Sequence, residues 1–283
     1  MAVPSPGPSP AAESDPLRVA VAGFGAIGFE VARAIDAGAV PGLALAAVAA
    51  RDLERARARC AKFRSTPVVR PATELAALAD VVVECAPAAA FAEIARPALE
   101  AGRILVCVSV GALLDHFDCV DLAARRGGRI LVPSGALLGL DAVQAAARGE
   151  VEEVRMVTRK PPAGLAGVPW LVERGIDVHA LGEPTRVFEG TAREGARRFP
   201  ANVNVAAALG LAGVGPDRTR LEIWVDPTVT RNTHDITVEA QAARFTLHIE
   251  NVPSEANPRT GRLVAPSVLA TLAKLTSPLV VGT

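Results

Sequence analysis

The segment between residues 17 and 37 constrains the fold of this chain most strongly. An apolar run over Leu17–Ala22 leads directly into the pattern Gly-x-Gly-x-x-Gly, formed by Gly23, Gly25 and Gly28, and a helical pattern follows over Ala26–Ala37. A buried strand, a glycine-rich turn and a helix in this order are typical of the first unit of a dinucleotide-binding domain. The three glycines would in turn permit the tight turn, let the backbone approach a pyrophosphate, and let the helix pack against the strand.

The turn also predicts where the phosphates of a dinucleotide would bind. The first turn of the expected helix has backbone N–H groups without partners inside the helix, and the helix dipole adds a partial positive charge there. We therefore expect five residues of this segment to contact the cofactor: Gly23, Gly25, Ala26, Ile27 and Gly28.

The end of the second expected strand, Leu43–Ala50, bears on the choice between two nicotinamide cofactors. An acidic residue at this position hydrogen-bonds the ribose 2′-hydroxyl of NAD, whereas a basic residue accommodates the 2′-phosphate of NADP. Here Arg51 comes first and Asp52 follows. We expect both residues to contact the cofactor, with NAD used and NADP tolerated. Alternatively, Asp52 only caps the helix that follows.

Residues 16–148 alternate between short apolar runs and helical patterns, which predicts an α/β fold with a Rossmann-type, doubly wound parallel sheet. Ligands of such sheets bind beyond the carboxyl ends of the strands. This rule adds Ala86, Ser109 and Ala136 as expected cofactor contacts, with Ser134 as a further hydroxyl donor. The other expected strands are Asp80–Glu84, Arg103–Val108 and Arg129–Val132, and the other expected helices are Leu53–Lys62, Thr73–Leu78 with Thr73 as its N-cap, and Ala88–Ala101.

The pattern changes after residue 148 and predicts a second, α+β domain over residues 149–262. Val151–Thr158 alternates between apolar and polar residues, as in a strand with one exposed face. A Pro/Gly-rich loop is expected from Lys160 to Pro169. The remaining expected elements are a strand over Arg186–Glu189, helices over Thr191–Arg198 and Ala201–Ala212, an antiparallel meander of Leu221–Val225, Asp235–Ala240 and Phe245–Glu250, and a helix over Pro266–Leu275. Residues 263–283 are expected to pack back on the first domain.

Composition excludes several classes of partner. The 283 residues carry 30 Lys and Arg against 30 Asp and Glu, without a basic stripe and without tyrosine, so no nucleic acid is expected as a partner. No apolar run is long enough to span a membrane, and the Pro/Ser/Ala-rich residues 1–15 predict a disordered tail. The four cysteines lack metal-ligand spacing and are expected to be free, so we expect a cytoplasmic protein without a metal; they are Cys60, Cys85, Cys107 and Cys119.

A series of short strings gives a more specific indication. They are Pro133-Ser134-Gly135-Ala136, Thr158-Arg159-Lys160-Pro161-Pro162, Phe199-Pro200-Ala201-Asn202-Val203-Asn204-Val205-Ala206, Asp226-Pro227, Arg231-Asn232-Thr233-His234-Asp235-Ile236, Asn251-Val252-Pro253-Ser254 and Asn257-Pro258-Arg259-Thr260. With the glycine turn, they resemble the L-aspartate dehydrogenase family over nearly the whole chain after the tail. One departure is Ser254-Glu255-Ala256-Asn257, where the family usually has Ser-Pro-Glu-Asn.

The resemblance implies the NAD(P)-dependent oxidative deamination of L-aspartate to iminoaspartate, which yields oxaloacetate and ammonia, and the reverse reaction. It implies His234 as the catalytic residue and adds Asn204 and Ala136 to the nucleotide contacts. In some organisms the family supplies iminoaspartate for NAD biosynthesis. We also expect a homodimer.

The residues themselves suit this chemistry. An imidazole titrates near working pH, so His234 suits a general base, although a lone histidine is often only structural. Lys160 ends a strand and is the expected ligand of a substrate carboxylate, unless it is a solvated surface lysine. Asn204, in an apolar helix, would bind the nicotinamide amide or a substrate carboxylate. Alternatively, it only caps the helix or hydrogen-bonds a second helix. Arg231 and Asn232 are expected to assist in substrate binding.

Two other functions remain open at this point. One is another two-domain nicotinamide reductase, of the homoserine or dihydrodipicolinate type, although the double-histidine and Lys-x-Asp segment of the dipicolinate reductases is absent. The other is a nucleotide-sensing protein without turnover, which would keep the glycine turn but would not need His234.

Overall fold

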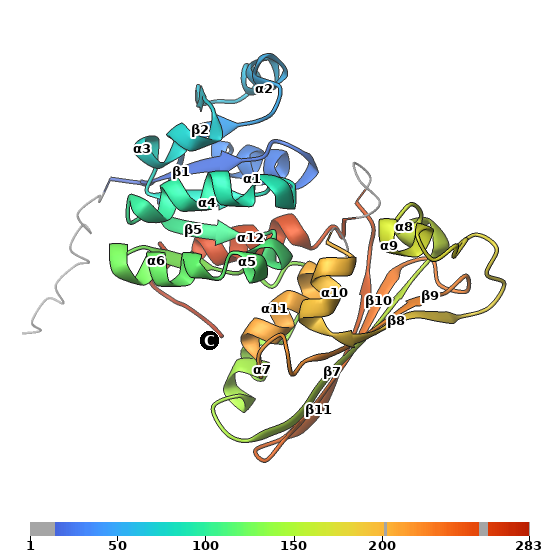
Figure 1. Ribbon diagram of the computed structural model, residues 1–283. Helices are drawn as coiled ribbons and strands as arrows, with labels where there is room; N and C mark the ends of the chain where they lie inside the picture. Colours follow the sequence, from blue (N-terminus) through green and yellow to red (C-terminus); the bar gives the residue numbers. More distant parts are fainter. Residues whose placement is uncertain (1–14, 201–202, 255–259, 283) are drawn as a thin grey trace, which may run out of the picture.

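The computed structural model describes residues 15–200, 203–254 and 260–282, which form two sheets with their helices (Figure 1). The N-terminal segment that was expected to be disordered lies almost wholly outside the described residues. So do Ala201 and Asn202, where a helix was expected to begin, and the departure from the family pattern at Glu255–Asn257.

The first sheet has six parallel strands in the order β3-β2-β1-β4-β5-β6. This is the doubly wound order, and the chain reverses direction across the sheet between β1 and β4. The predicted fold class is therefore confirmed. The strands are β1 (Leu17–Ala22), β2 (Leu43–Ala49), β3 (Val68–Val69), β4 (Val81–Glu84), β5 (Ile104–Cys107) and β6 (Arg129–Leu131). No strand was expected at β3, because its two residues are too few to form a local pattern.

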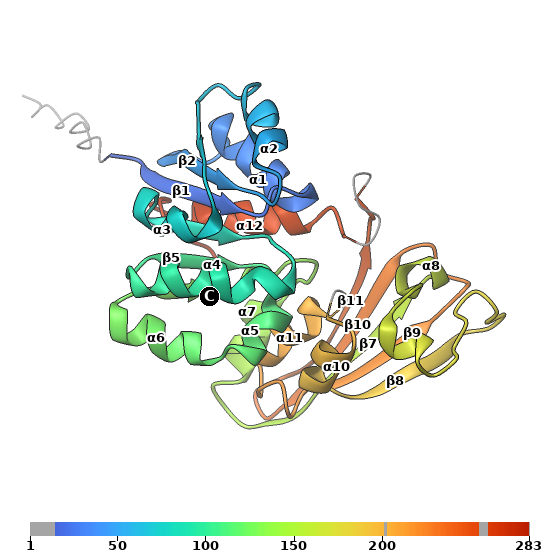
Figure 2. The same ribbon diagram turned by 45° about the horizontal axis from the view of Figure 1, so that its top comes forward.

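Helices cover both faces of this sheet (Figures 1 and 2). On one face α1 (Ala26–Asp36) packs with β1 and β2, and on the other α3 (Leu75–Leu78) and α4 (Phe91–Glu100) form a separate apolar core. The expected N-cap at Thr73 is wrong. A 3₁₀ turn, η1 (Ala72–Glu74), begins there after Pro71 instead, because the fixed φ of proline suits the start of a helical turn. The remaining elements of this unit are α2 (Leu53–Cys60), the 3₁₀ turn η2 (Ala88–Ala90), α5 (Val110–Asp115) and α6 (Asp118–Arg126).

The second sheet has five strands in the order β11-β10-β7-β9-β8. The predicted meander is wrong: only β10 (Asn232–Ala240) and β11 (Arg244–Asn251) form a hairpin. The long strand β7 (Val151–Lys160) lies between β10 and β9 (Arg220–Val225), antiparallel to the first and parallel to the second. Buried Val154 and Met156 suit this central position, where both edges of the strand are paired. The edge strand is β8 (Thr185–Thr191), antiparallel to β9.

Helices α10 (Ala192–Arg198) and α11 (Asn204–Ala212) cover one face of this sheet, together with α7 (Leu140–Ala146) (Figures 1 and 2). The start of α10 is fixed by a capping box, in which Thr191 and Glu194 satisfy each other's backbone N–H groups. The segment that was expected to be a loop contains two short helices, α8 (Pro162–Leu165) and α9 (Pro169–Val172), each with a proline at its first position.

The last helix, α12 (Val264–Ala273), returns to the first sheet and packs against α1. Its Val268 and Leu272 are buried in the same core as the glycine-turn helix. The chain therefore passes between the two units twice, after β6 and before α12 (Figure 1).

Candidate active site

The glycine turn between β1 and α1 has the geometry that its sequence predicted. Gly23 has a φ of +93°, and a Cβ there would lie 2.6 Å from the carbonyl carbon of Cys85. A Cβ at Gly28 would lie 1.9 Å from the carbonyl oxygen of Gly23, so the helix passes too close to the turn for any side chain. A Cβ at Gly25 would meet no protein atom within 4 Å. The space at Gly25 faces an open cleft.

This cleft runs along the carboxyl ends of the strands, with a volume of about 1200 Å³. The glycine turn, the end of β2 and the loop after β4 line it, including Ala26, Ile27, Arg51 and Ala86. Asp52 also lines the cleft, and it accepts a hydrogen bond of 2.9 Å from the backbone N–H of Arg55. Asp52 is thus the N-cap of α2, as in the alternative interpretation of the sequence, while it remains at the cleft wall.

A buried carboxyl that sequence reasoning missed supports the loops beside this cleft. Glu84, the last residue of β4, is fully buried, and its oxygens accept hydrogen bonds of 2.9 Å from the backbone N–H groups of Ala86 and Ser109. Burial raises the pKa of Glu84, and the hydrogen bonds from Ser109 oppose this effect. The sequence showed Glu84 only as the end of an apolar strand.

The expectation that Ser109 contacts the cofactor is not supported by its position. Its hydroxyl lies 2.9 Å from both Glu84 Oε1 and the carbonyl oxygen of Ala86, and its side chain is buried and does not line the cleft. Cys107, the last residue of β5, pairs with Glu84. The hydrogen bonds to Glu84 therefore direct the Ser109 side chain toward the protein interior. Ser109 therefore belongs to the support of the Ala86 loop.

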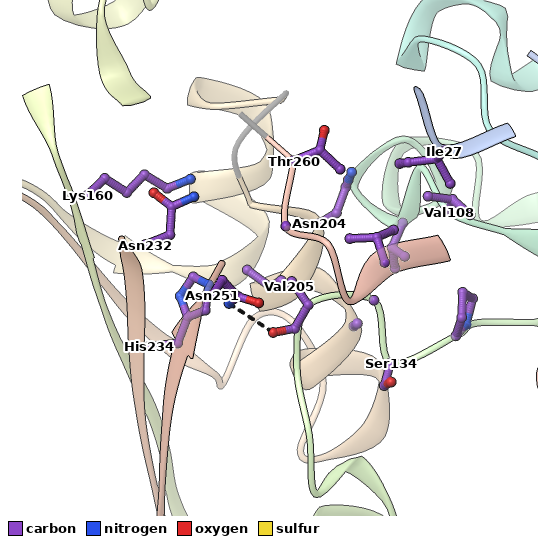
Figure 3. Close-up of a pocket in the computed structure, with 17 residues that line it drawn as sticks. Ile27, Val108, Ser134, Lys160, Asn204, Val205, Asn232, His234, Asn251 and Thr260 are labelled. Carbon is purple, nitrogen blue, oxygen red and sulfur yellow. Dashed lines mark hydrogen bonds between the residues drawn. The ribbon is translucent and has the colours of Figure 1, made fainter. Parts of the chain in front are cut away.

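A second, smaller cavity of about 130 Å³ lies between the two units. Ile27 and Thr260 line both this cavity and the cleft, so the two spaces are adjacent. Figure 3 shows Lys160, Asn232 and His234 on one side of the cavity and Ile27 and Val108 on the other. The first unit thus supplies an apolar wall, and most polar groups come from the second sheet, which also contributes Asn251. Ser134 and Asn204 add further polar groups, and Ala136 also lines the cavity.

His234 lies in β10, directly opposite Thr158 of β7, and is only 3% exposed. Its Nδ1 is 3.1 Å from the hydroxyl oxygen of Thr158. Burial first, and then the charge of Lys160, lower the pKa of His234 to about 3. The expectation of an imidazole that titrates near working pH is therefore wrong: this ring is neutral from acidic to alkaline pH.

Lys160 is the last residue of β7 and lies on the same face of the sheet as Thr158, two residues earlier. Its side chain lines the cavity and is only 4% exposed, so the alternative of a solvated surface lysine is wrong. Burial lowers the pKa of Lys160 to about 8. The cavity therefore holds a buried ammonium group that is charged at neutral pH.

Two asparagines connect the cavity to neighbouring loops. Asn204 begins α11, and its Oδ1 accepts a 3.0 Å hydrogen bond from the backbone N–H of Gly111 in α5, which leaves its Nδ2 group as a donor. Asn251, which sequence reasoning missed, donates from Nδ2 to the carbonyl oxygen of Ala136 over 3.1 Å (Figure 3). The string that contains Asn251 was the only signal for it. Both units are thus joined by hydrogen bonds at the rim of the cavity.

Arg231 is not among the residues that line the cavity. It is exposed and pairs with Glu250 of β11 over 3.7 Å, because it lies just before the first residue of β10. Asp235 follows His234 but points to the opposite face, where its carboxylate lies 2.6 Å from Nδ1 of His248 and raises the pKa of that ring. Alternation along β10 explains why Asn232 and His234 reach the cavity and Asp235 does not.

Across residues 15–200, 203–254 and 260–282, no three His, Cys, Asp or Glu side chains gather as a metal site requires. In the same residues, none of the helices has the length and apolar character to cross a bilayer. The four cysteines are free, and Cys60, Cys107 and Cys119 are buried.

The cleft fits a dinucleotide by its own geometry. Gly25 offers no side chain to the first turn of α1, so the N–H groups of that turn face a space that a Cβ would partly fill. The smaller cavity, adjacent to the cleft, is where the nicotinamide end would meet a substrate.

Comparisons with known proteins agree with this geometry. The family model for the C-terminal domain of aspartate dehydrogenase matches residues 141–275, and the model for the NAD-binding domain of homoserine dehydrogenase matches residues 23–133. The chain is 56% identical to an L-aspartate dehydrogenase of Bradyrhizobium diazoefficiens, over 95% of each chain. It is 52% identical to L-aspartate dehydrogenase 3 of Bordetella bronchiseptica, over 94% of this chain and 98% of the other.

A solved structure extends the comparison. The crystal structure of aspartate dehydrogenase from Thermotoga maritima superposes with a TM-score of 0.70 at 25% identity, over 94% of this chain and 99% of the other. The resemblance that the short strings predicted is confirmed, since identity above one half extends over nearly the whole chain. This chain belongs to the L-aspartate dehydrogenase family.

Proposed function

We propose that this protein is an NAD(P)-dependent L-aspartate dehydrogenase. The reaction oxidises L-aspartate to iminoaspartate by loss of a hydride from Cα and a proton from the amine, and water then releases oxaloacetate and ammonia. The observation that supports it best is the pairing of a neutral buried imidazole with a buried ammonium group in one cavity, beside a dinucleotide cleft. Relatives named L-aspartate dehydrogenase over nearly the whole chain make aspartate the expected substrate.

The cleft and the smaller cavity bind different parts of the cofactor. The glycine turn and the start of α1 bind the pyrophosphate, and Asn204 and the loop at Ala136 hold the nicotinamide end. When bound, the nicotinamide supplies the hydride acceptor. The apolar wall of Ile27 and Val108 keeps water from the opposite side of the cavity.

Lys160 binds a carboxylate of the substrate. Its ammonium group is desolvated, so pairing with a carboxylate is stronger than it would be at the surface. Asn232 lies beside it in the cavity and donates from its amide to the same carboxylate (Figure 3). Together they orient Cα toward the nicotinamide side.

His234 manages protons. In the tautomer in which Nδ1 donates to Thr158, Nε2 keeps its lone pair and accepts a proton from the amine or from the water that attacks the imine carbon. Burial and the charge of Lys160 hold the ring neutral in the resting protein, so Nε2 has its lone pair available. A substrate carboxylate paired with Lys160 would offset that charge and raise the basicity of the ring. Thr158 fixes the ring orientation from the neighbouring strand.

A substrate comparison tests this proposal. Oxidation of NADPH and NADH is followed with oxaloacetate plus ammonium and with oxaloacetate alone. An aspartate dehydrogenase requires ammonium and forms aspartate. Oxidation that ignores ammonium would indicate a hydroxyacid enzyme, and cofactor binding without oxidation would indicate a sensor.

We further propose that the protein is a homodimer that uses the outer face of the five-stranded sheet. Opposite to α10 and α11, this face carries charged groups of both signs, such as exposed Arg155 beside buried Glu222 and Asp235 beside His248. Such a face can pair with a second copy of itself, each cation meeting an anion. The cytoplasmic location and the supply of iminoaspartate to NAD biosynthesis stay predictions, the first consistent with free cysteines.

A further inference from the structure

Three arginines line one end of the dinucleotide cleft, where β2 ends and α2 begins. They are Arg51, Arg55 and Arg59. Arg51 precedes the N-cap of α2, and Arg55 and Arg59 follow at successive turns of the helix, so their side chains share one side of it. In a doubly wound sheet this position faces the ribose of the adenosine half of the cofactor.

The acidic groups near these arginines do not neutralise their positive charge. Asp52 uses a carboxylate oxygen to cap α2, and Glu93 of α4 lines the cleft as its second carboxylate. Glu54 pairs with Arg57, and neither residue lines the cleft. The charged lining is therefore three cations against two carboxylates, of which one already serves as a helix cap.

Arg59 is held in place by the glycine turn itself. Its Nη1 donates a 2.7 Å hydrogen bond to the carbonyl oxygen of Phe24, and its Cζ lies 3.6 Å from the ring centroid of Phe29. A guanidinium has five N–H donors, so most of them stay available after the bond to Phe24. Burial and the nearby charge of Arg55 both lower the pKa of Arg59. A ligand that carries two negative charges would relieve the repulsion between these arginines.

We propose that Arg51, Arg55 and Arg59 bind the 2′-phosphate of NADP(H), and that this protein prefers NADP(H) to NAD(H). The proposal rests on the dinucleotide cleft of the proposed function but not on aspartate as the substrate. A phosphate monoester matches a cluster of guanidinium groups in charge and in hydrogen-bond geometry. A ribose 2′-hydroxyl would leave the cluster without an anion. The preference reverses the expectation that NAD is used and NADP only tolerated.

Calorimetric titration of the full-length protein with 2′,5′-ADP and with 5′-AMP tests the proposal without catalysis. These fragments differ only in the 2′-phosphate. We expect 2′,5′-ADP to bind roughly 10- to 100-fold more tightly, as hydrogen bonds to charged groups allow. Added salt should reduce this advantage. The variants R51S and R55S should lose most of it, with little change in the affinity for 5′-AMP.

The matched control is R57S, on the same helix but outside the cleft lining, which should keep the full advantage. Equal affinity of the wild type for both fragments would overturn the preference. So would a loss of affinity in R51S and R55S that is the same for both fragments, since that indicates general attraction of anions. Failure of both fragments to bind would refute the cleft as a dinucleotide site, and the preference with it. A protein that binds 2′,5′-ADP selectively but does not act on aspartate would keep this proposal and overturn the proposed function.

Discussion

His234 shows how a strand position sets the chemistry of a single residue. The register of β10 on β7 places His234 opposite Thr158 and buries the ring. The contact with Thr158 fixes the orientation of the ring, and burial keeps it neutral. We predict that His234→Ala lowers kcat by a factor of roughly 10² to 10⁴, as loss of general acid–base catalysis does, with little change in nucleotide affinity. Steady-state kinetics and a cofactor titration measure both. The exposed His179 is the control, and near-normal turnover of His234→Ala would remove His234 from the mechanism.

Lys160 gives the site a dependence on pH. Because the pKa of Lys160 is about 8, its side chain is positively charged below pH 8 and loses its proton and its charge above pH 8. We predict that succinate, a dicarboxylate without an amine, binds with constant affinity well below pH 8 and about tenfold more weakly for each pH unit above it. The dissociation constant is measured from pH 6 to pH 10. Lys160→Met should bind weakly at every pH, and constant affinity of the wild type up to pH 10 would exclude Lys160 as the ligand.

Glu84 is the residue-scale feature that no motif signalled. Both of its oxygens accept backbone N–H groups, so an amide in its place would direct an NH₂ group at a donor. We predict that Glu84→Gln lowers the free energy of unfolding by about 1–3 kcal/mol and weakens nucleotide binding through the Ala86 loop. Denaturant unfolding and cofactor titration measure the two effects. Ser109→Ala, which keeps the backbone donors, should cost less, and an unchanged unfolding midpoint in Glu84→Gln would contradict this account.

At the scale of elements, different glycines of the β1–α1 turn serve cofactor binding and folding. We predict that Gly25→Val keeps the fold, because a Cβ there meets no protein atom within 4 Å, but raises the cofactor dissociation constant by filling the pyrophosphate space. Gly28→Ala should instead destabilise the fold, since its Cβ would lie 1.9 Å from a carbonyl oxygen. Thermal unfolding and cofactor titration distinguish the two variants. Unchanged cofactor affinity in Gly25→Val would contradict the assigned position of the pyrophosphate.

The elements also show what the sequence could and could not predict. The glycine turn and the apolar strands β1 and β4 follow from local patterns, and so does the capped helix α10. The position of β7 between β10 and β9 does not, because pairing of distant strands leaves no local signal beyond alternation. For the same reason Glu84 and Asn251 were missed, since their partners lie in other parts of the chain. The lowered pKa of His234 depends on burial, which composition around the residue did not reveal.

At the scale of the whole molecule, the outer face of the five-stranded sheet is expected to pair with a second copy. We predict that light scattering after gel filtration gives a mass of twice 29.2 kDa. Thr237, half-buried in β10 opposite Thr246 of β11, lies in the middle of that face, so Thr237→Arg should shift the protein toward the monomer. The surface variant R57S serves as the control. A monomeric wild type, or a Thr237→Arg variant that stays dimeric, would contradict this use of the face.

The two units act as one catalyst only if substrate and cofactor meet in the cavity between them. A crystal structure of the ternary complex with NADP⁺ and succinate measures this most directly. We predict a succinate carboxylate at hydrogen-bond distance, about 2.7–3.2 Å, from Nζ of Lys160, with the ligand between His234 and the nicotinamide ring. A dicarboxylate bound away from Lys160, or an imidazole that faces the sheet interior with no ligand atom near it, would show that Lys160 and His234 do not form the substrate site.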